Sequence, residues 1–238
     1  MEKKKLDEIL KKHAAWLNDE DGGERADLSG AYLRGAYLSC AYLRGADLRG
    51  ADLYCADLSD ADLIDADLRG ANLSCAYLRG AYLRGAYLSC ADLRGANLSC
   101  AYLSGAYLRG AYLSCAYLRG ANLIDADLSD TDLRCADLSG TFLSGADLSD
   151  TDLIDADLRG AAFDDHIVCL DRIGSEKRRT TYNATKDIVW CGCFRGTFEK
   201  WVAKIRATYP DENNVYRNEY EAAIAYFKAV AGANEKER

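Results

Sequence analysis

Several residue types are scarce in this 238-residue chain, and each scarcity argues against a particular class of protein. One proline in the whole sequence argues against disordered linkers. No apolar run approaches the length of a membrane-spanning helix, so we expect no membrane insertion. The two histidines, His13 and His166, are far apart, and residues 26–165 contain no Lys, Glu or His. The Asp side chains of these residues are expected to be solvated, with no evident reason for a shifted pKa, so we expect neither enzymatic activity nor a cofactor.

We also expect no secretory signal. The basic start at residues 1–5 is followed by a mixed amphipathic stretch rather than an apolar one. The ten cysteines therefore favour reduced thiols and a cytoplasmic location.

The sequence from Ala26 to Asp165 is one five-residue unit written twenty-eight times. The unit reads Ala-(Asp/Tyr/Asn)-Leu-(Arg/Ser)-(Gly/Cys/Asp). A period of five fits neither a helix nor a plain strand. It places Ala and Leu on one side of a short extended piece, and the next two residues must turn the chain. Repeated, this predicts a solenoid whose interior holds the central residues, from Leu28 through Leu93 to Leu158, with Phe163 in the last unit.

Segments such as ADLRG at 46–50 and ANLSC at 71–75 resemble the pentapeptide-repeat family. The resemblance implies a right-handed, four-sided β-helix with four units per coil, and hence seven coils. Neighbouring strands lie roughly 4.8 Å apart, which makes such a solenoid about 34 Å long.

The fifth residue of each unit forms a corner. Fourteen units have Gly there, as a type II turn with a positive φ favours, and the other fourteen have Cys or Asp. Because Cys tolerates that backbone poorly, we expect the Cys corners to leave type II geometry. Cys55 with Cys75, and Cys115 with Cys135, are twenty residues apart, which predicts stacked free thiols on one corner of adjacent coils.

Both open ends of such a solenoid need a cover. Residues 1–25 supply an N-terminal cap, with an amphipathic helix at 3–17 and Trp16 over the first coil. Residues 166–238 supply a small α+β capping module, so we expect a monomer. Its predicted elements are a three-stranded meander (167–173, 178–183, 187–194) and helices starting after Thr197 and near Val215. The stretch 191–199 resembles a terminal module of some bacterial and phage members of the family.

Acidic charge is concentrated late in the repeats. The formal net charge is −8, and residues 121–165 carry twelve Asp against Arg134 and Arg159. With twenty residues per coil, one face holds Asp127 and Asp147 and the next face holds Asp132 and Asp152, so the acid forms a belt. The resemblance implies a function for this acidic belt. Some pentapeptide-repeat proteins imitate the charge of duplex DNA and modulate type II topoisomerases such as DNA gyrase. The alternative is that Asp caps turns and solubilises the surface.

Tyrosine replaces the usual Asp or Asn around one whole coil, at Tyr102, Tyr107, Tyr112 and Tyr117. These side chains are either a partner surface, since Tyr is enriched at interface hot spots, or a lateral stack on neighbouring coils. Residues 66–90 and 91–115 are identical except for Arg79 against Ser104. The second copy begins twenty-five residues after the first, which is one unit more than a coil of twenty. Its pattern is therefore displaced by one face of the solenoid, and this weakens any interpretation that depends on a single face. Direct nucleic-acid binding is not expected, because the surrounding charge is not positive.

A zinc site is conceivable by count alone from His166, Cys169, Cys191 and Cys193, but the spacing is not that of a common zinc motif, so we expect no metal. The sequence thus predicts a non-enzymatic, rigid β-solenoid that acts as an interaction scaffold for an unknown protein partner. The alternative is a DNA mimic that binds a type II topoisomerase.

Overall fold

The computed structural model divides into two compact units, Met1–Ala162 and Phe163–Arg238. This division lies three residues before the predicted domain boundary. No helix among the described residues is long and apolar enough to cross a membrane. The structure describes residues 1–148, 150–153, 155–162, 167–173, 178–183, 188–191, 194–211, 214, 216–218, 220–221, 223–225 and 227.

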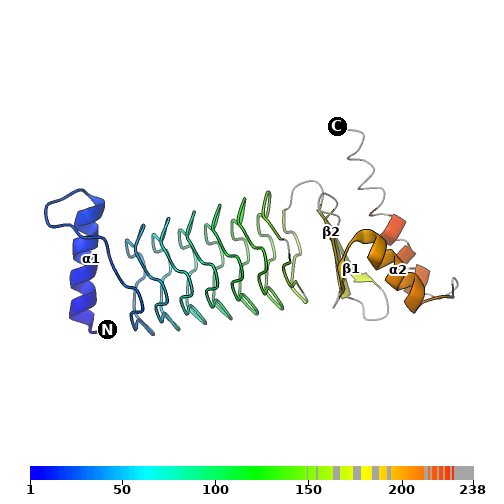
Figure 1. Cartoon of the computed structure of the whole chain (residues 1–238), viewed down its shortest axis with the longest axis horizontal. Coiled ribbons are helices and arrows are strands. Elements are labelled where there is room, and N and C mark those ends of the chain that lie inside the picture. The colour runs from blue at the N-terminus through cyan, green and yellow to red at the C-terminus, as the bar shows by residue number, and fades with distance from the viewer. Residues whose placement is uncertain are drawn as a thin grey trace. The chain divides into compact units, whose positions relative to one another are not determined.

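The repeats form the stacked coils of a β-helix (Figure 1). Parallel bridges join second-position residues twenty apart, from Asp27–Asp47 to Phe142–Ala162. Backbone hydrogen bonds repeat with the same step. The Leu28 N–H donates to the Asp47 carbonyl (2.7 Å), and the Asp47 N–H donates to the Ala26 carbonyl (3.0 Å). Four units therefore complete one coil wherever the structure describes the ladder.

Every described corner residue has a positive φ, whatever its side chain. The Gly corners range from 60° at Gly30 to 69° at Gly145, and the Cys and Asp corners range from 55° at Cys55 to 59° at Cys115. The prediction that Cys corners leave this geometry is therefore wrong. Two hydrogen bonds hold the corner at Cys40, whose N–H donates to the Ser59 carbonyl (2.9 Å) while the following Ala41 N–H donates across the turn (3.1 Å). They offset the cost of about 1–2 kcal/mol that a left-handed backbone imposes on an L-residue.

The interior of the coils is filled by Ala and Leu. Leu28, Leu93 and Leu158 are buried, as predicted, whereas Phe163 lies outside the described residues. Three units place Thr where Ala is usual, and each hydroxyl finds a carbonyl inside the tube, as a buried polar group requires. Thr131 and Thr151 both donate to the Leu128 carbonyl (2.6 and 2.8 Å), and Thr141 donates to the Leu138 carbonyl (2.8 Å).

Helix α1 (Lys3–Leu17) precedes the first coil and covers the predicted range. It lies at the N-terminal end of the stack (Figure 1). Leu6 and His13 are its buried residues. The Trp16 ring approaches the corner at Gly45, 3.9 Å from the position that a Cβ would take there.

The second unit contains an antiparallel sheet of order β1-β2-β3-β4, where a three-stranded meander was predicted. The third predicted strand is two strands, because Cys191 of β3 pairs with Phe194 of β4 across a two-residue connection. Gly192 lies between the two strands in the sequence, and Gly weakens the interior of a strand. The strands are β1 (Ile167–Ile173), β2 (Arg178–Asn183), β3 (Ile188–Cys191) and β4 (Phe194–Gly196).

Helix α2 (Phe198–Thr208) follows, and the Thr197 side chain caps it by accepting from the Lys200 N–H (3.4 Å). The described residues between 216 and 227 are also helical. The core of this unit draws on three segments: Tyr182 and Val189 from the sheet, Trp201 and Ile205 from α2, and Ala223, Ile224 and Phe227 from the last segment.

Candidate functional site

The outward residues of the repeats lie in four columns, one on each side of the stack. We call these faces A, B, C and D. Bridges connect the members of each column in order. Face A runs Asp27, Asp47, Asp67, Tyr87, Tyr107, Asp127, Asp147. Face B runs Tyr32, Asp52, Asn72, Asp92, Tyr112, Asp132, Asp152. Face C runs Tyr37, Asp57, Tyr77, Asn97, Tyr117, Asp137, Asp157, and face D runs Tyr42, Asp62, Tyr82, Tyr102, Asn122, Phe142, Ala162.

Most Asp and Asn side chains in these columns accept a hydrogen bond from the backbone N–H two residues later, in the turn of their own unit. The Asp27 Oδ1 accepts from the Ser29 N–H (3.0 Å), and the Asp47 Oδ1 accepts from the Arg49 N–H (3.1 Å). Asn72 does the same with Ser74 (3.1 Å). These bonds explain why short acceptor side chains suit the second position. They support the interpretation that Asp caps turns.

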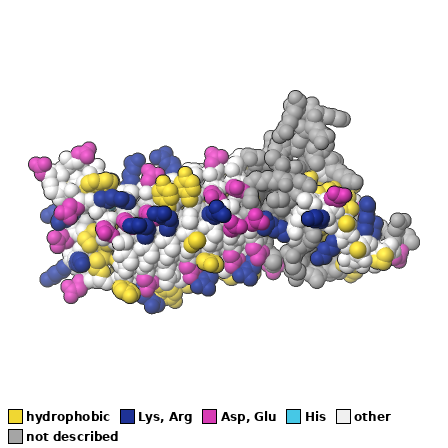
Figure 2. Space-filling model, viewed as in Figure 1, with side chains coloured by type: hydrophobic (Ala, Val, Ile, Leu, Met, Phe, Trp, Pro, Cys, Tyr) yellow, Lys and Arg dark blue, Asp and Glu magenta, His cyan; other side chains and the backbone are white. Residues whose placement is uncertain are grey.

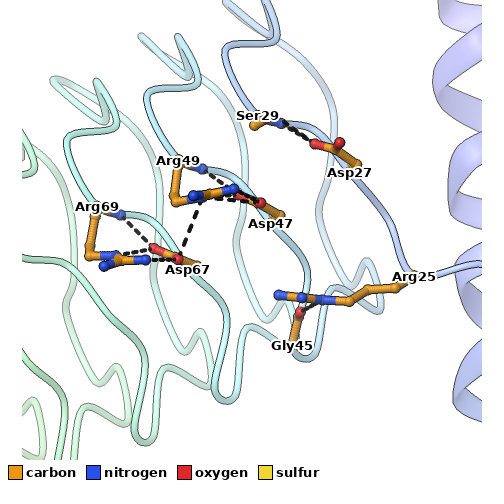
Figure 3. A network of polar contacts seen from close by, with 8 residues as sticks. All are labelled: Arg25, Asp27, Ser29, Gly45, Asp47, Arg49, Asp67 and Arg69. Carbon is orange, nitrogen blue, oxygen red and sulfur yellow. Dashed lines mark hydrogen bonds and ion pairs between the residues drawn. The ribbon is translucent and has the colours of Figure 1, made fainter.

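Arginine at the fourth position adds an ion pair within the unit (Figure 3). Arg49 Nε donates to Asp47 Oδ1 (2.8 Å) and lies 3.7 Å from Asp67 Oδ2 on the next coil. The hydrogen bond from Arg49 holds the pKa of the Asp47 carboxyl below its ordinary value. The Arg69 hydrogen bond does the same for Asp67. Such pairs also occur at Asp92–Arg94, Asp132–Arg134 and Asp157–Arg159.

Tyrosines stack where a column places two of them on adjacent coils. The Tyr87 and Tyr107 rings on face A lie 5.1 Å apart and nearly parallel, at 6°. Tyr82 and Tyr102 on face D lie 5.1 Å apart at 4°. The lateral-stacking interpretation therefore describes these four rings. Tyr107 remains 47% exposed, so its outer face is open to solvent.

The predicted partner surface separates over the four faces. Tyr107, Asp127 and Asp147 form one continuous column on face A, and Tyr112, Asp132 and Asp152 form the neighbouring column on face B. Tyr117 lies on face C and Tyr102 on face D. A partner that wraps around the edge between faces A and B can therefore contact six of the eight named residues, whereas the remaining two lie on the other two faces.

The acidic belt is uneven once the basic residues are placed on the same faces. Between residues 126 and 162, face A carries four Asp and no basic residue, and face B carries three Asp and Arg134. Face C carries two Asp and Arg159, and face D carries no charge. Figure 2 shows acidic side chains gathered toward the C-terminal end of the repeats on the side in view. Face A therefore holds the largest number of Asp in these residues, and Arg109 of the preceding coil pairs with one of them, Asp130 (3.2 Å).

One buried histidine joins α1 to the first coil, a role that the sequence pattern did not reveal. The His13 Nδ1 accepts from the Ala26 N–H (3.0 Å), and the imidazole stacks on Trp16 at 5.3 Å. Burial lowers the pKa of His13, the Arg44 carbonyl opposes this, and the Arg25 charge lowers it further. The imidazole is thus neutral and acts as an acceptor. Only the docking of α1 on the coil gives it this partner.

Metal-ligand clusters are absent from the part of the chain that the structure describes, where no three His, Cys, Asp or Glu side chains converge. Of the conceivable zinc set, His166 and Cys193 lie outside the described residues, as does the side chain of Cys169. Cys191 is half-buried, and its Sγ accepts from the Thr180 hydroxyl (3.0 Å). One hollow beside α1 includes Glu2, Lys5 and Asp27.

Comparison with known proteins gives a family match. The model for pentapeptide repeats matches in eight copies over residues 26–63, 61–99, 101–140 and 131–165. HetL, a heterocyst-differentiation protein of the cyanobacterium Nostoc, is similar at 34% identity, over 57% of this chain and 84% of HetL, with a TM-score of 0.34. A variant of QnrB1, a plasmid-mediated fluoroquinolone resistance protein, is 26% identical over 58% of this chain and 77% of its own, with a TM-score of 0.31. A thylakoid-lumen protein of Arabidopsis thaliana is 37% identical over 46% and 69%, with a TM-score of 0.22. No curated protein matches the chain.

Proposed function

We propose, from the premise that this chain belongs to the pentapeptide-repeat family, that it is a non-enzymatic, rigid scaffold. In this proposal it binds a protein partner through the C-terminal part of face A and the adjoining part of face B. The observation that carries the proposal is the uneven charge between residues 126 and 162, where face A holds four Asp without a basic residue. A basic patch on the partner would complement it, and such complementarity gives specificity and fast association.

The backbone beneath this surface favours binding at low entropic cost. The Leu108 N–H donates to the Asp127 carbonyl (2.7 Å), and the Leu128 N–H donates to the Asp147 carbonyl (2.8 Å). The Tyr107 ring is already held against Tyr87. A pre-organised surface loses little conformational freedom when a partner binds.

The internal duplication does not weaken this assignment. It covers residues 66–115, whereas the acidic segment begins at Asp125. The displacement of the second copy by one face therefore distributes the tyrosines of the middle coils over different faces. Asp127 and Asp147 lie outside the duplicated residues and are not affected.

Affinity capture with paired variants tests the proposal. Asp127→Asn with Asp147→Asn removes two charges from face A, and Asp137→Asn with Asp157→Asn removes two from face C of the same coils. We expect at least one protein to be retained by the wild type and by the face C variant, and lost from the face A variant. That protein, once purified, must bind wild type directly. Equal retention by both variants would reject face A as the binding surface.

A second function, modulation of a type II topoisomerase by DNA mimicry, is favoured by the density of charge. Duplex DNA carries about one charge per 1.7 Å, which is roughly six over the 10 Å height of two coils. Faces A and B together carry seven Asp and one Arg between residues 126 and 162, a net charge of −6. A supercoiling assay with purified DNA gyrase tests it. Inhibition at micromolar concentration or below that is lost in the Asp127→Asn, Asp147→Asn variant would favour mimicry over the scaffold.

We further propose that α1 and the second unit act as caps of the solenoid and that the protein is a monomer. Helix α1 supports this by burying Leu6 and His13 and by the hydrogen bond from Ala26 to His13. Light scattering on an eluting peak checks the state. A mass near 26.1 kDa is expected, and twice that mass would contradict it.

A further inference from the structure

One corner of the solenoid carries four of the ten cysteines. Its column runs Gly35, Cys55, Cys75, Gly95, Cys115, Cys135, Asp155. Hydrogen bonds fix the register, because the Cys55 N–H donates to the Ser74 carbonyl (3.1 Å) and the Cys115 N–H donates to the Arg134 carbonyl (2.8 Å). Cys55 and Cys75 are thus neighbours on adjacent coils, and so are Cys115 and Cys135. Gly95 separates the two pairs.

The corner cysteines whose next-coil neighbour is Gly show where the sulfur points. The Sγ of Cys90 lies 3.6 Å from the position that a Cβ would take at Gly110, and the Sγ of Cys100 lies 3.6 Å from that position at Gly120. The Sγ of Cys75 lies 3.7 Å from that position at Gly95. A corner thiol therefore leans along the stack toward the residue twenty positions later. Where that residue is Cys, the sulfur faces a second side chain of the same kind.

These separations are close to those of a disulfide. Adjacent coils are roughly 4.8 Å apart, within the range of about 4.4–6.8 Å that a disulfide allows between Cα atoms. All four corners share one backbone conformation, with φ of 55°, 58°, 59° and 58° at Cys55, Cys75, Cys115 and Cys135. Their Cβ atoms therefore leave the backbone in the same direction. Rotation about the Cα–Cβ bonds turns the sulfurs toward each other, and a slight approach of the two corners brings the Cβ atoms within the span of about 3.5–4.5 Å that a disulfide requires.

The two thiols of the second pair are equally accessible but differ in reactivity. Cys115 and Cys135 are both exposed. Desolvation raises the pKa of Cys135, and the Cys115 thiol and Asp155 raise it further. Because the thiolate is the attacking species, Cys135 is disfavoured as the first nucleophile, which leaves that step to Cys115.

We propose that Cys55–Cys75 and Cys115–Cys135 are two dithiol modification sites, which a low-molecular-weight disulfide oxidises to coil-to-coil disulfides. In the first step the Cys115 thiolate attacks one sulfur of the small disulfide, forms a mixed disulfide and releases one small thiolate. Cys135 then loses its proton and attacks the Cys115 sulfur, which forms the protein disulfide and releases the second small thiolate. Two protein thiols are oxidised and one small disulfide is reduced to two thiols.

The other described corner cysteines lack such a partner. Cys90 and Cys100 each have Gly on both adjacent coils, and Cys40 has Asp60 on the coil that follows. They can take a mixed disulfide, but no resolving thiol stands twenty residues away. The reaction thus links adjacent coils at two places, Cys55–Cys75 and Cys115–Cys135. Each of the other described corner cysteines has no second thiol with which to form a link.

Peptide mapping of the full-length protein tests the proposal. The reduced protein is incubated at low concentration with oxidised glutathione, the remaining thiols are alkylated, and the digest is analysed by mass spectrometry. We expect Cys55–Cys75 and Cys115–Cys135 links that retain no glutathione, whereas Cys90 and Cys100 either carry glutathione or remain alkylated. Cys135→Ser must convert Cys115 to a stable glutathione adduct. Retained glutathione on both Cys115 and Cys135 in the wild type would overturn the proposal.

Two glycine variants provide a gain-of-function test with a matched control. Gly110→Cys places a thiol opposite Cys90, where the structure leaves ordinary contact distance, and must create a third link, between Cys90 and the introduced thiol. Gly105→Cys adds a thiol at a corner whose neighbours are Gly85 and Asp125, and must create none. An additional link in the Gly105→Cys variant, or none in the Gly110→Cys variant, would contradict the twenty-residue register of the thiols.

Discussion

Residues 46–70 and 126–150 both place two Asp at the second position of face A units, but the residues at the fourth position of those units differ. In the first segment Arg49 and Arg69 pair with Asp47 and Asp67. In the second, Ser129 and Ser149 occupy the corresponding positions. The backbone bonds are alike, since the Leu48 N–H donates to the Asp67 carbonyl (2.7 Å) and the Leu128 N–H donates to the Asp147 carbonyl (2.8 Å). The coil therefore forms with or without the arginines, and the excess acid of the second segment is not a requirement of folding.

The largest expected effect concerns the core that the two segments share. Leu93 lies between them and is fully buried. Leu93→Asp would bury an unpaired carboxylate, at a cost of several kcal/mol. Leu93→Ala should cost roughly 2–5 kcal/mol through the cavity it leaves. Thermal and urea unfolding measure both, with the surface variant Asp127→Asn as the control, expected within about 0.5 kcal/mol of wild type. An unchanged melting temperature for Leu93→Asp would contradict the inward position of Leu.

A smaller effect is expected where face A begins, at the coil that α1 contacts. His13→Ala leaves the buried Ala26 N–H without its acceptor, which should cost about 1–3 kcal/mol in urea unfolding. His13→Asn offers a carbonyl oxygen near the same place and should recover part of the loss.

The same histidine predicts a pH dependence. Because burial lowers the pKa of His13, its contribution is complete above the ordinary value of 6.5 and is lost as the pH falls below it toward the folded pKa. Between pH 7.5 and 5, wild type should therefore lose more stability than His13→Asn. Equal losses for the two proteins in urea unfolding would contradict a lowered pKa of His13 in the folded state.

The smallest effect on stability concerns the ion pairs that distinguish the two segments. Arg49→Ser makes the first segment resemble the second. The pKa of the Asp47 carboxyl should rise toward its ordinary value, because the hydrogen bond from Arg49 is its largest lowering cause. Stability should change little, since the Arg49 side chain is half-exposed and solvent screens its charge. The loss should appear above pH 3.8 and vanish as the pH falls through the lowered pKa of Asp47. NMR titration of Asp47 in both proteins is the measurement.

The repeat stack was predictable because each of its contacts recurs every five or twenty residues. Position in the unit alone placed Leu93 inside and Tyr107 outside. The conformation of Cys corners was not predictable from local preference, because bonds to the next coil, such as Cys40 to Ser59, decide it. The sequence did not predict β3 and β4 as separate strands, because residues 187–194 form one apolar run and Gly192 alone did not indicate an interruption.

The sequence predicted which residues make up the candidate site but not how their charge is distributed over the four faces. The twenty-residue step placed Asp127 with Asp147, yet the unevenness of the belt depends on which faces Arg134 and Arg159 occupy. The role of His13 could not be predicted, because it requires the docking of α1 against Ala26.

The central claim is that the excess of Asp over Arg at residues 126–150 serves binding and is not needed for folding, and Ser129→Arg tests it most directly. This variant gives Asp127 the arginine that Asp47 already has, so the melting temperature should stay within a few degrees of wild type. Binding of the protein captured by wild type, measured by biolayer interferometry, should weaken at least about tenfold, because an added cation faces the partner's basic patch. Unchanged affinity with unchanged stability would contradict the account.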